Sequence, residues 1–155
     1  MDSGLVMKRT LIILAILVTL GTSGLLAQTR YQQNIAVEQS SALVMAVTTD
    51  VLVNWAPQTI RDNASRELLA RESAEQIQQR FIPMSRRLGA LQEIYDIEYD
   101  VDIPGWWQPD ATARAQYTMS ARFQSEVATV RLELIRENGR WLISEYDIQP
   151  PRIAA

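Results

Sequence analysis

The chain has 155 residues, a net charge of −3, and neither cysteine nor histidine. This length suits one domain with a core large enough to fold without disulfides or a structural metal. The missing cysteine excludes disulfides, thiol nucleophiles and thiolate metal sites, and the missing histidine removes the commonest metal ligand and the usual proton-transfer group near neutral pH. The basic residues are one lysine and scattered arginines, so we expect no nucleic-acid partner.

An uncharged apolar segment occupies residues 11–27, directly after Lys8 and Arg9. It is at the short end of the lengths that span a bilayer, where about 20 residues are usual. Because positive charge stays inside, residues 1–10 are expected in the cytoplasm and the rest of the chain in the periplasm of a bacterial inner-membrane protein. The alternative is a cleaved signal peptide. The candidate cleavage site after Ala27 has Leu25 at position −3, where a small residue is usual, and this argues against cleavage.

The remainder is expected to form one extracytoplasmic domain, residues 28–150, followed by a tail, residues 151–155. Residues 28–56 contain neither glycine nor proline and follow helical spacing, which predicts a helix ended by Pro57. A second helix is expected to begin at an N-cap, Asn63, and to stop at Gly89. Pro83 inside it should kink or break this helix.

Residues 95–103 alternate between apolar and acidic side chains, which predicts a half-buried strand. We expect its core side to carry Tyr95, Ile97, Tyr99, Val101 and Ile103, and its solvent side Asp96, Glu98, Asp100 and Asp102. Alternate carboxylates lie about 7 Å apart, too far for most of them to share one cation. A solvated ladder facing Arg114, Arg122 and Arg131 on neighbouring strands is therefore expected. A protein-docking face and an all-oxygen cation site are the alternatives.

Residues 114–124 repeat the alternation, and Asn138-Gly139 predicts a hairpin between two further strands. Helices followed by strands indicate an α+β fold, in which a curved antiparallel sheet of about four strands wraps over the helices.

The closing segment "ARFQSEVATVRLELIRENGRWLISEYDIQP", with "RRLGAL" before the first long strand, resembles the nuclear transport factor 2-like superfamily. The resemblance covers roughly residues 31–150 and implies a cystatin-like α+β cone, similar to membrane-anchored bacterial envelope proteins of unknown function. The superfamily includes isomerases, dehydratases, polyketide cyclases, transport and scaffold proteins, and components of secretion machines, so the fold alone does not select a function. Its enzymes generally use an acid or histidine inside the cone. No residue of this chain matches a catalytic position, and we expect no catalytic residue, cofactor or metal.

Two sets of residues are candidates for binding. Aromatic side chains that could line a pocket for an apolar ligand are Tyr95, Tyr99, Tyr117 and Trp141. Plain core packing is the alternative, and the pattern favours it.

The second set would contact a partner. Trp106 and Trp107 lie adjacent between two prolines, and one exposed tryptophan would suit a protein interface. Loop packing over the cone or the membrane boundary are the alternatives. Arg86 and Arg87 at a helix end could contact an acidic partner or anionic lipid, although they also suit the helix dipole.

These features predict a non-catalytic accessory, assembly or scaffold subunit of a larger inner-membrane or envelope complex. Its partners would be the lipid bilayer and other membrane or periplasmic proteins, of a secretion, respiratory, photosynthetic or transport complex. A periplasmic module that binds a small hydrophobe is the alternative, followed by an isomerase or lyase of the same fold.

Overall fold

The computed structural model describes residues 31–105, 108 and 111–150. The expected membrane segment, residues 11–27, and the tryptophan pair therefore lie outside the described residues.

The chain divides into two units, Met1–Ile35 and Ala36–Ala155. Of the N-terminal unit, only residues 31–35 are described.

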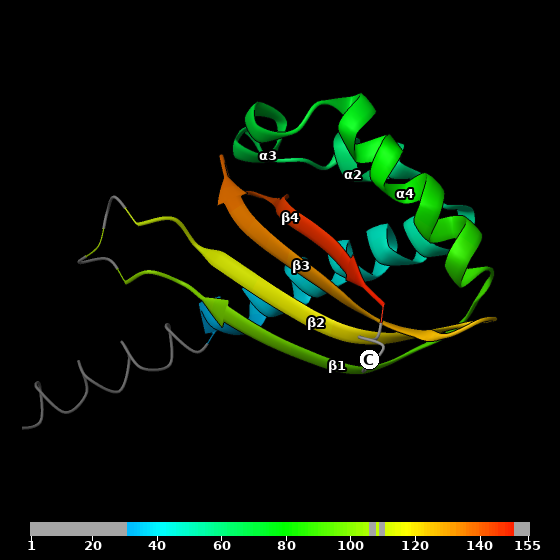
Figure 1. Ribbon diagram of the computed structural model, residues 1–155. Helices are drawn as coiled ribbons and strands as arrows, with labels where there is room; N and C mark the ends of the chain where they lie inside the picture. The colour runs from blue at the N-terminus through cyan, green and yellow to red at the C-terminus, as the bar shows by residue number, and fades with distance from the viewer. Residues whose placement is uncertain (1–30, 106–107, 109–110, 151–155) are drawn as a thin grey trace, which may run out of the picture. The chain divides into compact units, whose positions relative to one another are not determined.

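The second unit is an α+β fold in which helices pack against a four-stranded antiparallel sheet (Figure 1). The strand order β1-β2-β3-β4 follows the sequence. The α+β class and the four-stranded antiparallel sheet expected from the sequence are confirmed. The described elements are a helix at Tyr31–Asn54 (the long helix), α2 (Pro57–Asp62), α3 (Arg66–Arg71), α4 (Ala74–Leu88), β1 (Leu91–Asp102), β2 (Arg114–Phe123), β3 (Val127–Glu137) and β4 (Arg140–Gln149).

The long helix contributes one side of the core. Figure 1 shows it crossing one face of the sheet, with α2 to α4 beside β4. By length and composition alone it could also cross a membrane or act as a signal. Its buried positions nevertheless recur at helical spacing and pack in the core of the second unit. They are Ala36, Ser40, Val44, Val47, Thr48, Val51 and Leu52.

The predicted second helix is in fact two helices, because two serines begin new helices. Ser65 caps α3 through its side chain, and Ser73 forms a capping box with Gln76 at the start of α4. The N-cap expected at Asn63 was wrong. Asn63 instead ends α2, and its amide donates to the Thr59 carbonyl.

Helix α4 continues through Pro83, so the expected break does not occur. Pro83 is exposed, while Ile77 and Phe81 before it and Leu88 after it are buried. Packing on both sides of the proline offsets the backbone hydrogen bond that proline removes. The predicted stop at Gly89 is confirmed, with φ of 77°.

A bulge divides β1 and changes which side chains share a face. Tyr95 pairs with Ser120 and Tyr99 with Tyr117, with a register shift between them and a positive φ at Asp96. The strict alternation expected over residues 95–103 is therefore wrong, because the extra residue reverses the alternation. Tyr99 lies on the helix-facing side of the sheet, and Tyr95 lies on the opposite side, here called the outer face.

The predicted hairpin at Asn138 and Gly139 is confirmed, with φ of 50° and 78°. A bulge also lies in β4, at Ser144, because Glu133 pairs with Glu145 and Leu134 with Ile143. The extra residue lets side chains before and after it face the helices. Trp141, Ile143 and Tyr146 are all buried.

Candidate functional site

The interior of the second unit contains a buried hydroxyl pair. Ser40 Oγ on the long helix lies 2.7 Å from Tyr117 Oη on β2, and both residues are at most 1% exposed. Ser40 Oγ also donates to the Ala36 carbonyl at 2.7 Å, so Tyr117 is the donor to Ser40. Burial raises the pKa of Tyr117, and the bond to Ser40 partly opposes this rise. The phenol therefore stays neutral at physiological pH.

A second buried tyrosine, Tyr146, lies between α4 and the sheet. Its ring centroid is 5.8 Å from that of Phe81, and burial raises its pKa strongly. The nearby Thr48 hydroxyl partly opposes this rise in the pKa of Tyr146. Neither Thr48 Oγ1 nor Tyr146 Oη has a partner in hydrogen-bonding geometry among the described residues. The adjoining void holds about 10 Å³, room for about one water. It is lined by Arg80, Phe81, Met84, Tyr146 and Ile148.

The four aromatic residues expected to line a pocket do not share one. Tyr99 stacks on Tyr117 with ring centroids 5.7 Å apart, but it is 58% exposed at the sheet edge. Tyr95 lies on the outer face, with the guanidinium of Arg122 5.2 Å from its ring centroid. Trp141 is buried on β4, two strands away from Tyr117. Of the four residues, the structure therefore brings only Tyr99 and Tyr117 into contact.

Acidic groups are absent from the described interior. Its buried polar residues are Ser40, Thr48, Ser65 and Ser144. Across residues 31–105, 108 and 111–150, no group of three or more acids is placed to hold a metal ion. The described core thus supplies hydroxyls and indole but no buried carboxylate.

The outer face carries the charged ladder, in a register that differs from the expected one. Asp102 does lie opposite Arg114. Arg122 forms an ion pair of 3.3 Å with Glu93, an acid outside the expected stripe. Arg131 is not beside β1 and lies opposite Asp147 on β4.

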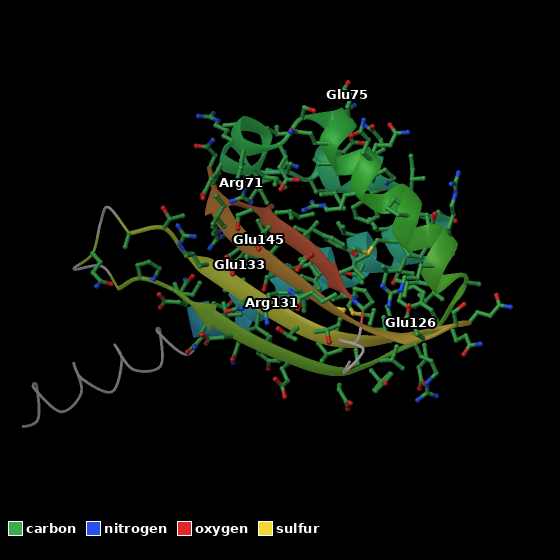
Figure 2. The ribbon with its side chains drawn as sticks, viewed as in Figure 1. Arg71, Glu75, Glu126, Arg131, Glu133 and Glu145 are labelled. Atoms are coloured by element: carbon green, nitrogen blue, oxygen red, sulfur yellow. The ribbon has the colours of Figure 1, made fainter. Side chains whose placement is uncertain are left out.

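One row across the outer face is acidic. Asp100 pairs with Gln116, which pairs with Glu133, which in turn lies directly opposite Glu145. Figure 2 shows Glu133 and Glu145 projecting from neighbouring strands, close to Arg131. Like charges directly opposite one another are destabilising, so this row is a feature that sheet stability alone does not favour. Sequence reasoning missed it, because the pairing of Glu133 with Glu145 depends on the bulge at Ser144.

The two arginines expected at a partner surface differ in their surroundings. Arg87 forms a bidentate ion pair with Glu126 in the turn between β2 and β3, with Nε–Oε1 of 2.5 Å and Nη2–Oε2 of 3.2 Å. The same turn is joined to the end of α4 by the Ser125 N–H, which donates to the Leu88 carbonyl. Arg86 and Arg87 are both exposed, but Arg87 is already paired within the domain, whereas no ion pair is found for Arg86 among the described residues. The contact expected from Trp106 and Trp107 stays a prediction.

Comparison with known proteins supplies no family. No family model matches the chain, and neither the curated proteins nor the solved structures include a match.

Proposed function

We propose that the chain is a non-catalytic accessory, assembly or scaffold subunit of a larger inner-membrane or envelope complex, with a domain of the nuclear transport factor 2-like type. The small size of the void beside the buried Tyr146, within the described residues, is the observation that carries this proposal. Ligand pockets usually enclose about 300–1,000 Å³. The void beside Tyr146 holds about 10 Å³. A void of this size leaves no room for a ligand beside Tyr146, which favours contacts with other molecules at the surface.

The chemistry of the core supports the same proposal. General acid–base catalysis needs a group whose pKa lies near the working pH. The buried hydroxyls of Tyr117 and Tyr146 have raised pKa values and stay protonated. Histidine is absent from the whole chain and the described interior contains no carboxylate, so its buried serines have no usual general base beside them.

The membrane anchor is assigned to residues 11–27. The long helix is apolar, but its apolar face packs against the sheet in the core. Membrane insertion of that helix would remove the buried Ser40–Tyr117 bond and expose the matching face of the sheet. Lys8 and Arg9 ahead of the uncharged segment support an N-terminus in the cytoplasm and a periplasmic domain.

A periplasmic module that binds a small hydrophobe is the second candidate. The hydroxyls of Thr48 and Tyr146 could orient such a ligand. Binding would require Phe81 and Met84 to move away from the sheet, because the present void admits about one water. A rise in melting temperature with small hydrophobes would favour this candidate.

Co-purification tests the proposal. The full chain, tagged at its C-terminus, should elute from gently solubilised native membranes together with membrane proteins in fixed stoichiometry. Trp106→Ala/Trp107→Ala should lose those proteins, whereas Leu69→Ala, which truncates an exposed apolar side chain on α3, should retain them. Elution of the wild-type chain alone would contradict the proposal. A double variant that keeps every partner would instead remove the tryptophans from the interface.

A further inference from the structure

The two edges of the sheet differ in what covers them. At β4, the Ser65 N–H donates to the Ile143 carbonyl and the Ile143 N–H donates to the Asn63 carbonyl, each at 2.8 Å. Arg71 Nη2 donates to the Ser144 carbonyl at 2.9 Å. Along β1, β2 supplies the backbone partners found among the described residues. Within residues 31–105, 108 and 111–150, no strand pairs with the opposite side of β1, the lower edge of the sheet in Figure 1, and this side could accept an added strand.

This free edge is acidic on the outer face. Glu98 and Asp100 lie directly opposite the neutral residues Thr118 and Gln116 on β2. Beyond Thr118 the row of Glu98 reaches Arg131 on β3, whereas the row of Asp100 contains no basic residue. Beyond Gln116 comes a further carboxylate, Glu133. The carboxylates in the row of Asp100 therefore have no basic residue among their directly paired neighbours.

A hollow beside the edge suits a basic side chain. It measures about 230 Å³ on the outer face. Its charged lining consists of three carboxylates and one guanidinium: Asp100, Asp102, Glu133 and Arg114. The excess of carboxylates favours an arginine or lysine that enters from the open side of β1.

The other side of the same edge is apolar. Tyr99 is 58% exposed although its ring stacks on the buried Tyr117, and Ile97 at the bulge is 42% exposed. Successive side chains of an added strand would point alternately to the two faces of the sheet. One set would contact Tyr99, and the other would approach Glu98 and Asp100.

Charge complementarity decides which occupant fits. A second copy of the chain would bring the carboxylates of one β1 against those of another, which is unfavourable. We propose that the free edge of β1 binds an extended segment of a partner protein that has arginine or lysine on one face and apolar residues on the other. This segment would add a fifth strand to the sheet. The inference rests on the proposed function and specifies the docking surface and the chemistry of the partner.

Hydrogen exchange with a defined probe tests the edge directly. The probe is a heptapeptide of alternating arginine and valine, added to the full chain in a neutral detergent. An added strand hydrogen-bonds the open amides of β1, so we expect their exchange to slow about tenfold or more at saturation. A heptapeptide of alternating glutamate and valine should leave the exchange of β1 unchanged. Amides of β4 should be unaffected by either peptide.

Charge reversal provides the matched variants. Glu98→Lys/Asp100→Lys should weaken binding of the arginine peptide about tenfold or more, and it should let the glutamate peptide protect β1. Glu145→Lys/Asp147→Lys reverses the same number of charges on the same face of β4, roughly three strand spacings away, beyond a Debye length in physiological salt. That control should change the affinity less than about threefold.

Unchanged exchange of β1 in the wild-type chain with the arginine peptide would overturn the inference, without recourse to any variant. Equal weakening by the β1 and β4 variants would also overturn it, because binding would then follow net charge alone. These outcomes leave the proposed function standing if the wild-type chain still co-purifies with membrane proteins. Isolation of the wild-type chain without partners contradicts the proposed function instead.

Discussion

The hydroxyls of Ser40 and Tyr117 lie 2.7 Å apart inside the core, although the two residues are 77 positions apart in the chain. The bond joins the long helix to β2. Tyr146 is equally buried, but its hydroxyl has no partner within the described part of the chain. The two tyrosines therefore form a matched pair for measuring what one buried hydrogen bond contributes.

We expect Tyr117→Phe to lower the free energy of unfolding by about 0.5–1.5 kcal/mol, because it removes a buried hydrogen bond. Tyr146→Phe should be neutral or stabilising, because it removes a desolvated hydroxyl that is not bonded. Urea unfolding of both variants and the wild type in one buffer measures the difference. An equal loss in the two variants would contradict the assigned hydrogen bonding.

The pKa of Tyr146 gives a prediction at alkaline pH. Burial raises this pKa above the ordinary value of 10.0. Above pH 10 the unfolded chain releases a proton that the folded chain retains, so stability is complete below pH 10 and falls as the pH rises beyond it. Tyr146→Phe removes this contribution and should unfold at a higher pH than the wild type. Circular dichroism between pH 9 and 12 checks the shift, and identical midpoints would contradict it.

The loss of stability at acidic pH should depend on Asp50. Hydrogen bonds from the side chains of Thr59 and Asn54 lower the pKa of Asp50 below its ordinary value of 3.8. The carboxylate thus stabilises the folded chain above about pH 3.8, and this contribution is lost as the pH falls through the lower folded value.

Asp50→Asn should therefore flatten the loss of stability below pH 4. Glu38→Gln, at an exposed position on the same helix, serves as the control and should leave the loss of stability below pH 4 unchanged. Chemical unfolding at a series of pH values measures both slopes. If Asp50→Asn and the wild type lose stability with the same slope below pH 4, the role of the two hydrogen bonds is contradicted.

Local signals predicted much of the fold. Helical periodicity identified the long helix, and Asn138-Gly139 identified the hairpin, since a type I′ turn requires positive φ at both positions. The division of the second helix was also readable, because Ser73 and Gln76 have the spacing of a capping box. That signal competed with continuous apolar periodicity through the segment.

The bulges could not be read from the sequence, because they depend on which residues pair across strands. An extra residue in β1 placed Tyr95 and Tyr99 on opposite faces, and this separated the expected pocket. An extra residue in β4 placed Glu145 opposite Glu133. The open edge of β1 is likewise a tertiary property, since it depends on the segment around Ser65 covering β4 and not β1.

Two glycines with positive φ lead to a last prediction. Gly89, between α4 and β1, has φ of 77° and ψ of −151°, a conformation restricted essentially to glycine. A Cβ there would lie 3.3 Å from the Gln124 Cβ. Gly139 has a similar φ of 78°, but a Cβ there would meet no atom within 4 Å.

Gly139→Ala should cost about 1–2 kcal/mol of stability, the usual penalty of left-handed backbone. Gly89→Ala should cost more, because a rarer conformation and a close contact add to that penalty. Thermal and urea unfolding of the two variants decide the order. Equal losses would contradict both added penalties, and would mean that the backbone at residue 89 relaxes and the turn carrying Gln124 and Glu126 moves away from α4 without cost. The Arg87–Glu126 pair would then have little part in holding that turn, and Glu126→Gln should be as stable as the wild type.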